Sequence, residues 1–266
     1  MRLLSFVGCL GLATGAIAET FDCVIVPAVT VSVGSPVSGL IEKVFVKQGD
    51  LVSSGQMIAK LRSEVERKTV QLLAVEAESA AEIEAQASRL LLAEKQLARV
   101  RDLLDRQVAP QERFEAAEAE VEVIRREKSI AHMRQQIAIL ELERARARLE
   151  QRIIHSPIDG VVIERHMFDG EFLYAEADVV SIAQIDPLHV EAYLPVSYFG
   201  RVAVGETLLV FPDQPLQGSF QATVDVVDRV FDAASGTFGL RLSLPNPELK
   251  IPAGHRCKVK MTEIGN

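Results

Sequence analysis

The chain contains one segment twice, and this repeat constrains the fold more than any other feature of the sequence. Residues 35–61 match residues 156–182 without a gap, so that Pro36 corresponds to Pro157, 121 positions later. Each copy predicts a strand after a Ser-Pro turn, a second strand after a Gly-acid turn and a third strand with an apolar end. About 90 residues of helix-forming sequence separate the copies. The matched positions are Ser35, Pro36, Gly39, Gly49, Asp50, Leu51, Ile58 and Leu61 in the first copy, and Ser156, Pro157, Gly160, Gly170, Glu171, Phe172, Val179 and Ile182 in the second.

Glycine recurs at equivalent places in the two copies. Gly39 and Gly49 in the first copy correspond to Gly160 and Gly170 in the second. Tight turns often need a residue with positive φ, which glycine adopts without steric cost. All four glycines are therefore expected to lie in such turns.

The insertion begins with a stretch that predicts one long helix. Residues 63–106 contain no Pro or Gly and are rich in Ala, Glu, Leu, Arg and Gln, which have high helix propensities. Ser63 and Glu66 have the spacing of a capping box, in which the two side chains satisfy free amides of the first turn. A repeat of seven residues predicts a narrow stripe packed on a partner helix. This repeat comprises Ile83, Leu90, Leu97 and Leu104, with Ala80 and Ala87 beside it.

A second helix is predicted over residues 111–150, after a break at residues 107–110. Two helices of similar length with a short break between them indicate an antiparallel hairpin. An arm of 40 residues extends roughly 60 Å at about 1.5 Å per residue. The loop at the apex is thus placed to contact something far from the base. One row of the second helix comprises Ala117, Ile124, Ala131, Ala138 and Ala145, and the other comprises Phe114, Val121, Leu142 and Leu149, interrupted by Lys128 and Gln135.

Several short strands separated by turns follow the second copy. Residues 188–196, 208–213, 220–230 and 238–244 have strand-forming sequences, and Pro- or Gly-containing clusters separate them. Short strands at such intervals favour a small antiparallel β-barrel.

The N-terminus resembles a secretory signal. Arg2 precedes an apolar or small stretch over residues 3–18, which ends in Ala16-Ile17-Ala18. This arrangement predicts cleavage after Ala18. An uncleaved membrane anchor is the alternative, although the stretch is shorter than the about 20 apolar residues of a membrane span.

Cleavage after Ala18 leaves two cysteines, Cys23 and Cys257, near opposite ends of the mature chain. An exported compartment permits a disulfide between them. Two separately buried thiols are the alternative.

Charge and metal-ligand spacing exclude other classes of function. The net charge of −8 and the pI near 5.3 are opposite to the clustered basic charge that nucleic-acid binding requires. The cysteines have no C-x-x-C spacing and the histidines form no pair with metal-ligand spacing. No nucleic-acid partner, metal or cofactor is therefore expected. The histidines are His132, His155, His166, His189 and His255.

The two half-motifs with the hairpin between them resemble a known family over about residues 24–261. The segments SPVSGLIEKVFVKQGDLVSSGQMIAKL and SPIDGVVIERHMFDGEFLYAEADVVSIA are similar to the lipoyl-like domain of periplasmic adaptor subunits. These adaptors, also called membrane fusion proteins of the HlyD-like family, belong to tripartite efflux pumps of the resistance-nodulation-division (RND) type. The resemblance implies an elongated α+β protein in which a long antiparallel coiled-coil hairpin splits a lipoyl-like β-sandwich and a small antiparallel β-barrel follows.

The implied domains cover the whole chain. A membrane-proximal domain, which many relatives have, is expected to be absent. The expected parts are a signal peptide (1–18), an N-terminal strand segment (19–34), the first lipoyl-like half (35–62), the hairpin (63–152), the second half (153–184), the barrel (185–261) and a C-terminal tail (262–266).

The apex of the hairpin resembles the docking motif by which such adaptors bind an outer-membrane duct. In that motif Leu follows Arg by four residues and Ser follows Leu by seven. Arg99 and Leu103 match, whereas Pro110 replaces the Ser and is expected to begin the second helix, because Pro is suited to the first helical position. Arg106 and Val108 complete the expected docking set. Ordinary surface and seam roles for Arg99 and Leu103 are the alternative.

The resemblance implies a periplasmic protein held at the inner membrane by its transporter. Its partners would be an RND-type transporter, an outer-membrane duct and further copies of itself in a ring, commonly of six. An adaptor of an ATP-binding cassette (ABC) exporter or of type I secretion is the alternative.

A remote alternative is a biotinyl or lipoyl carrier, which shares the half-motifs and presents a modified Lys between them. Lys60 is the nearest candidate, but the hairpin occupies the modified position and no Ala-Met-Lys-Met sequence occurs. We therefore expect a protein that is not an enzyme.

Overall fold

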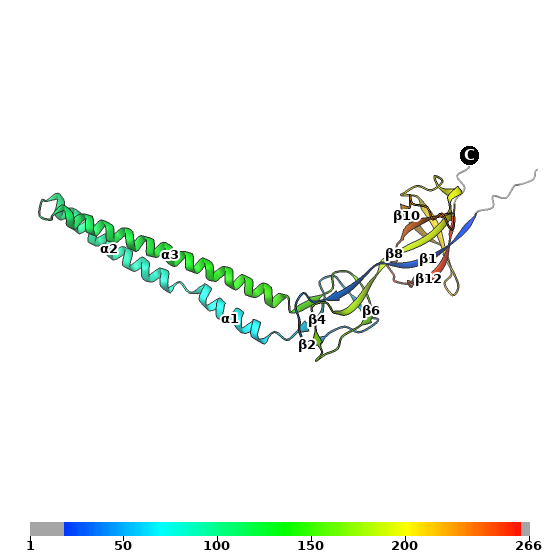
Figure 1. Ribbon diagram of the computed structural model, residues 1–266, viewed down its shortest axis with the longest axis horizontal. Coiled ribbons are helices and arrows are strands. Elements are labelled where there is room, and N and C mark those ends of the chain that lie inside the picture. Colours follow the sequence, from blue (N-terminus) through cyan, green and yellow to red (C-terminus); the bar gives the residue numbers. More distant parts are fainter. Residues whose placement is uncertain (1–18, 262–266) are drawn as a thin grey trace, which may run out of the picture.

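The computed structural model describes residues 19–261 and shows an elongated molecule with three parts in a row (Figure 1). A long helical hairpin lies at one end, a β-barrel lies at the other, and a β-sandwich joins them. The expected signal peptide and C-terminal tail lie outside the described residues. Within them, no helix combines the length and the apolar character needed to cross a bilayer.

The sandwich contains the three strands predicted for each copy of the repeat, which confirms that expectation. The first copy forms β2 (Gly39–Val44), β3 (Leu51–Val52) and β4 (Met57–Leu61). The second copy forms β6 (Gly160–Arg165), β7 (Phe172–Leu173) and the first part of β8 (Asp178–Pro195). The strands β6, β7 and β8 each begin 121 residues after their counterparts.

The two copies interlock, because each pairs its strands with those of the other. In β2, Leu40 lies opposite Phe172 of β7, and the equivalent pair joins Val161 of β6 to Leu51 of β3. The hydrogen bonds repeat as well. The N–H of Ile41 donates to the Glu171 carbonyl at 2.9 Å, and that of Val162 donates to the Asp50 carbonyl at 2.9 Å. Neither copy therefore completes its sheet alone. The shared core comprises Val33, Ile41, Val44, Val46, Val52, Ile58, Ala59, Leu61, Ile154, Val162, Leu173, Val179, Val180 and Ile182.

The glycine prediction is correct for one pair and wrong for the other. Gly49 and Gly170 have φ of 90° and 86°, as a tight turn requires. Gly39 and Gly160 instead lie at the starts of β2 and β6, where their lack of a side chain permits close packing. A Cβ at Gly39 would lie 2.6 Å from the Arg152 guanidinium, and one at Gly160 would lie 2.3 Å from the Ala183 carbonyl oxygen.

The first arm of the hairpin is two helices, so the prediction of one long helix is wrong. These are α1 (Glu64–Glu78) and α2 (Ala81–Asp105), and Ser79 between them is extended with ψ of 115°. The amide of Gln135, on the opposite arm, lies 3.5 Å from the Ala77 carbonyl and 3.4 Å from the Ser79 carbonyl. It donates to carbonyl groups next to the break. Helix propensity is a weak preference that such tertiary contacts override.

The second arm is the continuous helix α3 (Gln111–Glu150), and its contact with the first arm follows the predicted seven-residue rows. All of the side chains in these two rows are buried or half-buried. Ile83, Leu90, Leu97 and Leu104 of α2 are half-buried, and Val100 beside them is buried. The fully buried members on α3 are Val121, Ile124, Ala131, Ala138, Leu142 and Ala145.

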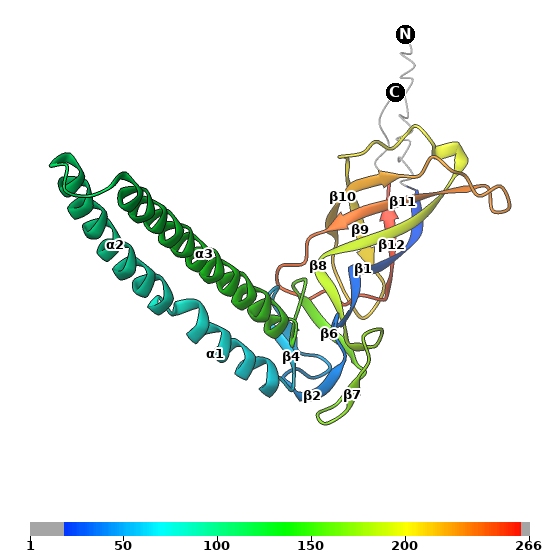
Figure 2. The ribbon, with the colours of Figure 1, turned by 60° about the vertical axis from the view of Figure 1, so that its left-hand side comes forward.

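The barrel contains the predicted strands and is closed by two strands that also belong to the sandwich. Its order is β1 (Thr20–Gly34), β12 (His255–Lys260), β9 (Thr207–Pro212), β10 (Phe220–Val227), β11 (Thr237–Leu244) and β8, and β8 pairs with β1 to close it. Both β1 and β8 run on into the sandwich, so the expected domain boundary after residue 184 falls within β8 (Figure 2). Short β5 (Ile153–His155) pairs with β4, and the 3-10 helix η1 (Val196–Tyr198) follows β8.

Cys23 of β1 lies directly opposite Cys257 of β12, and the two sulfur atoms are joined in a disulfide. The bond connects the first strand of the barrel to the last. Both cysteines are buried and pack in the barrel core. Neighbouring core side chains include Ile25, Leu188, Val190, Ala192, Leu208, Val210, Leu240, Leu242 and Val259.

Candidate functional site

The apex of the hairpin is a compact turn that ends α2 in a Schellman motif. The N–H of Val108 donates to the Leu103 carbonyl at 2.9 Å, and the N–H of Gln107 donates to the Leu104 carbonyl at 2.8 Å. These are the two hydrogen bonds that define the motif. They satisfy carbonyls that the end of a helix otherwise leaves free, so the apex has a defined shape.

Gln107 occupies the left-handed position of this motif, with φ of 60°. Glycine is the usual residue there, because a Cβ makes this conformation unfavourable by about 1 kcal/mol. The sequence prediction missed this residue, and no simple signal marks it, since Gln has high helix propensity. The backbone at the apex is thus held in a conformation that its own residue disfavours.

The five expected docking residues lie on or beside this turn. Val108 lies within the turn and is 71% exposed, whereas Leu103 is only 37% exposed. The guanidinium of Arg106 pairs with Asp102 at 3.1 Å on the solvent side. Arg99 is exposed one turn further down α2, with its Nε 3.4 Å from the Lys95 carbonyl of its own helix. The apex therefore exposes the apolar side chain of Val108 beside basic side chains.

Pro110 departs slightly from its predicted position. It precedes the first residue of α3 and has an extended ψ of 152°, so it is the N-cap residue and not the first helical residue. A Pro side chain cannot accept a hydrogen bond from the first turn, and α3 has no side-chain cap hydrogen bond.

A contact that the sequence prediction missed supports the turn from below. The Arg101 guanidinium of α2 lies over the Phe114 ring of α3, 5.4 Å from its centroid. This cation–π contact joins the two arms one turn below the apex. The spacing of Arg101 and Phe114 around a break could have indicated a pair across the hairpin.

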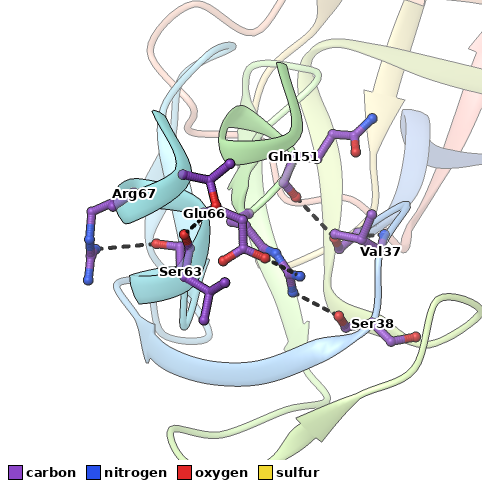
Figure 3. Close-up of polar contacts among 10 residues, drawn as sticks. Val37, Ser38, Ser63, Glu66, Arg67 and Gln151 are labelled. Atoms are coloured by element: carbon purple, nitrogen blue, oxygen red, sulfur yellow. Dashed lines mark hydrogen bonds and ion pairs between the residues drawn. The ribbon is translucent and has the colours of Figure 1, made fainter. Parts of the chain in front are cut away.

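The base of the hairpin is a second polar site, where Arg152 contacts Glu66 of the first arm and Ser38 of the sandwich. Figure 3 shows Glu66 and Ser38 close together at this base. The Arg152 guanidinium lies 2.5 Å from the Glu66 carboxylate of α1 and donates to the Ser38 carbonyl at 2.9 Å. The side chains of Arg152 and Glu66 are each only 22% exposed. One partly buried ion pair therefore links the beginning of α1 to the segment that follows α3.

This pair explains why the predicted capping box is wrong. Ser63 makes no side-chain cap hydrogen bond, and its hydroxyl instead lies 3.3 Å from the Arg67 guanidinium (Figure 3). Glu66 faces Arg152 and is thus not available to the N-terminal amide. Ion pairing between distant residues has replaced the local cap.

Backbone hydrogen bonds reinforce the same base. The N–H of Leu61 donates to the Arg152 carbonyl at 2.8 Å, and the N–H of Arg62 donates to the Leu40 carbonyl at 2.8 Å. The buried hydroxyl of Ser35 lies 3.3 Å from the Gln151 carbonyl. The root of the arm is consequently continuous with the β-sheet hydrogen bonding.

The barrel end farthest from the sandwich carries an exposed apolar loop, which we call the distal rim (residues 228–236). The register places it beside Pro195, at the end of β8 that points away from the sandwich. Val230 is 87% exposed, the highest value for a large apolar side chain in the described part of the chain. Phe231 next to it packs edge-to-face against Phe199, with ring centroids 4.9 Å apart, and Phe199 packs edge-to-face against buried Phe238 at 5.6 Å.

Hydrogen bonds to Asp232 order the distal rim. Its carboxylate accepts from the N–H groups of Ala234, at 2.8 Å, and Ser235, at 3.4 Å. These bonds, first of all the one from Ala234, lower the pKa of Asp232 below its ordinary value. The sequence prediction placed residues 228–230 at the end of a strand, whereas β10 ends at Val227 and these residues belong to the loop.

The remaining candidates do not form a chemical site. Lys60 lies within β4, where its ammonium pairs with Glu42 at 3.1 Å, and not at a free turn. His166 lies 2.8 Å from the Ser181 hydroxyl, and His255 lies 2.7 Å from the Asp213 carbonyl. Between residues 19 and 261, no three His, Cys, Asp or Glu side chains are grouped so that they could hold a metal ion.

The family model and the curated relatives that match this chain agree on one family. A model of the CzcB-like barrel-sandwich hybrid domain matches residues 29–184, more than half of the chain. The nickel-cobalt-cadmium resistance protein NccB of Alcaligenes xylosoxydans xylosoxydans is 24% identical over 212 residues, covering 79% of this chain and 50% of NccB. The cobalt-zinc-cadmium resistance protein CzcB of Cupriavidus metallidurans is 22% identical over 217 residues, covering 80% of this chain and 38% of CzcB. The chain thus spans half or less of the length of these curated relatives.

Solved structures show the same fold. MacA from Actinobacillus actinomycetemcomitans superposes with a TM-score of 0.77 at 21% identity, covering 92% of this chain and 78% of MacA. A MacA-MexA chimera with the α-hairpin domain of Pseudomonas aeruginosa MexA superposes with a TM-score of 0.57 at 20% identity, covering 91% of this chain and 80% of the chimera.

Proposed function

This chain belongs to the CzcB-like barrel-sandwich hybrid family of efflux adaptors, and we propose that it bridges an inner-membrane transporter and an outer-membrane duct. The family is non-catalytic, so the work of the chain is to connect, seal and transmit conformational change. The observation that carries the proposal is the defined apex with exposed Val108, at the end of the molecule opposite the barrel (Figure 1).

The dimensions of the hairpin support a bridging role. The 40 residues of α3 extend about 60 Å at about 1.5 Å per residue. Most side chains on the arms are exposed, and the fully buried ones lie along the contact between the arms. An arm of this form extends the molecule and adds few side chains to a hydrophobic core. It would hold the apex against the duct while the barrel stays close to the inner membrane.

We propose that the apex binds the duct through Val108 and the basic side chains around it. Val108 supplies apolar area, and Arg99 and Arg106 supply donors for carbonyl or carboxylate groups on the duct. Leu103 and Pro110 shape the turn that presents them. A Ser hydroxyl is not required in this arrangement, because the Schellman hydrogen bonds already fix the turn.

Cross-linking tests this docking directly. Val108→Cys is expected to cross-link to an outer-membrane duct in cells that produce both proteins, and Val108→Asp is expected to abolish assembly of the pump. Glu127→Cys, on an exposed part of α3 far from the apex, is the matched control and should capture no duct. Capture of a duct from position 127 but not from position 108 would disprove docking by the apex.

We propose that the distal rim faces the transporter. Its exposed Val230 precedes Phe231, whose ring packs edge-to-face against Phe199, and it lies at the barrel end away from the hairpin. The charges of Asp228 and Asp232 beside Arg229 do not favour an anionic lipid surface. A photo-cross-linking residue at position 230 should capture the transporter, and the same residue at exposed Gln221 on β10 should not. Capture of lipid alone from position 230 would refute this orientation.

The transporter is proposed to be of the RND type, as the half-motifs suggest. Purification of the chain with its cross-linked partner identifies the type, and recovery of an ABC transporter would overturn this part of the proposal. The cargo is proposed to be a small solute. Because NccB and CzcB are named for resistance to nickel, cobalt, zinc and cadmium, growth of a deletion strain on these metals is the first cargo test.

The remaining proposals concern location and assembly. The chain is proposed to be periplasmic, with its N-terminus at Glu19 after cleavage, and N-terminal sequencing of the exported protein tests this. Several copies, commonly six in relatives, are proposed to form a ring whose hairpins point toward the duct. Intermolecular cross-links in the assembled pump test the ring.

A further inference from the structure

A cavity of about 400 Å³ lies at the root of the hairpin, where α1, α3 and the sandwich meet. We call it the root cavity. Its lining includes Val37 of the sandwich, Val65 and Leu73 of α1, and Arg144 and Arg148 of α3. Pockets for small organic ligands usually have volumes of about 300–1,000 Å³, so the root cavity is large enough for one.

The side of the root cavity that the end of α3 forms is basic. Arg144 and Arg148 line it at a spacing of four residues, and Arg152 follows four residues later. Side chains four residues apart are neighbours on one face of a helix, and like charges at that spacing destabilise the helix slightly. An arginine near the C-terminus of a helix is favourable by itself, but that effect does not account for a row that lines one cavity. An anion bound between Arg144 and Arg148 would remove their repulsion.

Two of these three arginines have no counter-charge in the fold. Arg152 pairs with Glu66. In the described part of the chain, no carboxylate forms an ion pair with Arg144 or Arg148, and both side chains are exposed. The lining contains one further carboxylate, that of Glu141. With three guanidinium groups and two carboxylates around it, the root cavity keeps one positive charge and favours a ligand with one negative charge.

The side of the root cavity that α1 forms is apolar. Val65 and Leu73 both line it, and they lie about 12 Å apart along the helix axis at about 1.5 Å per residue. Leu73 is half-buried and packs against the buried cluster of Ala77, Ala138 and Leu142. Val65 is 76% exposed. A single exposed valine needs no explanation, but this one borders the same cavity as the two unpaired arginines.

We propose that the root cavity binds an amphipathic organic monoanion, with its carboxylate between Arg144 and Arg148 and its apolar body along Val65 and Leu73. Guanidinium groups bind carboxylates through paired, charge-assisted hydrogen bonds, which suits this row. The apolar body would remove Val65 from water and so add hydrophobic stabilisation. The site needs neither a duct nor a transporter, and it is independent of the bridging function.

Such a ligand would contact both arms and the sandwich at once. Figure 3 shows Val37 of the sandwich, Glu66 of α1 and Gln151 after α3 at this base, and all three line the root cavity. A ligand shifts a conformational equilibrium by as much as its affinities for the two states differ. Occupancy should therefore hold the arm in the orientation seen here and slow the local opening of α1.

Titration calorimetry with decanoate tests the site, because decanoate carries one carboxylate and a linear apolar chain. The full exported chain, purified from the periplasm, is expected to bind one decanoate per chain at concentrations too low for micelles to form. Decyltrimethylammonium has the same apolar chain and the opposite charge, and acetate lacks the apolar chain. Neither should bind at the same concentrations.

Paired substitutions locate the binding. Arg144→Gln/Arg148→Gln is expected to weaken decanoate binding about tenfold or more, since both charged donors are lost. Arg146→Gln, between them in sequence but outside the lining, is the matched control and should change binding less than about twofold. Val65→Asn should weaken binding about fivefold or more, whereas Val75→Asn, at a similarly exposed valine of α1 outside the lining, should not.

Hydrogen exchange gives an independent readout. Decanoate is expected to slow the exchange of the amides of residues 64–70 in the wild type and to have no such effect in Arg144→Gln/Arg148→Gln. Circular dichroism of each variant verifies that the helices are folded, so that a loss of binding is not a loss of fold.

Three results would overturn the proposal. One is the absence of saturable decanoate binding to the folded wild type, and another is equal binding by Arg144→Gln/Arg148→Gln. The third is self-association of the chain in sedimentation experiments that this double variant abolishes and decanoate does not disturb. That result would show that a second copy of the chain, and not a small anion, occupies the lining.

Discussion

Replacing Arg152 with alanine is expected to loosen the root of the hairpin. In the structure its guanidinium pairs with Glu66 at 2.5 Å and donates to the Ser38 carbonyl at 2.9 Å, and the paired side chains are each 22% exposed. The substitution leaves a largely enclosed carboxylate without its counter-charge and a carbonyl without its donor. The first turns of α1 would then separate from the sandwich more often.

The size of the effect follows from this partial burial. A fully exposed ion pair contributes about 0–1 kcal/mol, and removing one partner of a fully buried pair costs about 3–5 kcal/mol. With hydrogen bonds to charged groups worth about 1.5–3 kcal/mol, a cost of about 2–3 kcal/mol is expected. This corresponds to a roughly 30- to 150-fold rise in the local opening equilibrium at about 1.4 kcal/mol per tenfold.

Hydrogen exchange measured by mass spectrometry is the appropriate assay, because it reports local opening of α1 separately from global unfolding. Amides of residues 64–70 should exchange about 30- to 150-fold faster in Arg152→Ala, while the barrel strands should be unaffected. Arg148→Ala, an exposed position in the last turn of α3, is the matched control. Surface changes are usually within about 0.5 kcal/mol, so less than about a threefold change is expected there.

A double-mutant cycle decides whether the pair itself is responsible. If Glu66 and Arg152 act together, Glu66→Gln should add little further exchange to Arg152→Ala, although each change alone has a clear effect. Purely additive effects, or an Arg152→Ala variant that exchanges like the Arg148→Ala control, would refute the reasoning. Duct capture from Val108→Cys should also fall in Arg152→Ala, because a tilt of about 5° at the root of a roughly 60 Å arm moves the apex by about 5 Å.

Three further predictions concern the apex, the barrel and the distal rim. Gln107→Gly is expected to stabilise the apex by up to about 1 kcal/mol, since glycine adopts positive φ without the Cβ cost, and slower exchange of the Val108 amide measures it. Cys23→Ser/Cys257→Ser is expected to destabilise the barrel by about 2–5 kcal/mol in thermal unfolding, and equal melting of oxidised wild type and variant would contradict the disulfide. The pKa of Asp232 is lower in the folded rim than its ordinary value of 3.8, so its stabilising contribution is complete above that value and is lost as the pH falls through the lowered pKa. NMR titration of the rim amides should show this loss, and Asp232→Asn should remove the pH dependence.

Features that depend on local spacing could be predicted from the sequence. The seven-residue rows identified the contact between the two arms, because a helix places such residues on one face regardless of what lies elsewhere. The repeat identified six strands at the correct offset, because the turn residues that bound each strand recur at the same spacing in both copies. At the apex, spacing identified Val108 and Pro110 as part of the turn, but not the left-handed backbone of Gln107 between them.

Features that depend on distant residues could not be predicted. The break at Ser79 involves Gln135, which lies 56 residues away in sequence and donates to carbonyls beside the break. The capping box is absent because Arg152 pairs with Glu66 from the other arm. The domain boundary expected after residue 184 is crossed by β8, since that strand pairs with β1 along both the sandwich and the barrel. In each case a tertiary contact outweighs a local preference of at most about 1–2 kcal/mol.

The way in which the insertion joins the sandwich explains how the direction of such a long arm is fixed. The arm leaves from β4 and returns through β5, and these strands are hydrogen-bonded neighbours with Lys60 opposite Ile153. Its two ends are therefore about 5 Å apart, the spacing of adjacent strands, so the insertion need not disturb the sheet. The same proximity means that any rotation of this strand pair turns both arms together. With the Arg152 contact fixing the angle and the interlocked repeats fixing the strands, the direction of the apex is determined at the sandwich. A change in the barrel can reach that sandwich through β1 and β8, which are continuous between the two parts.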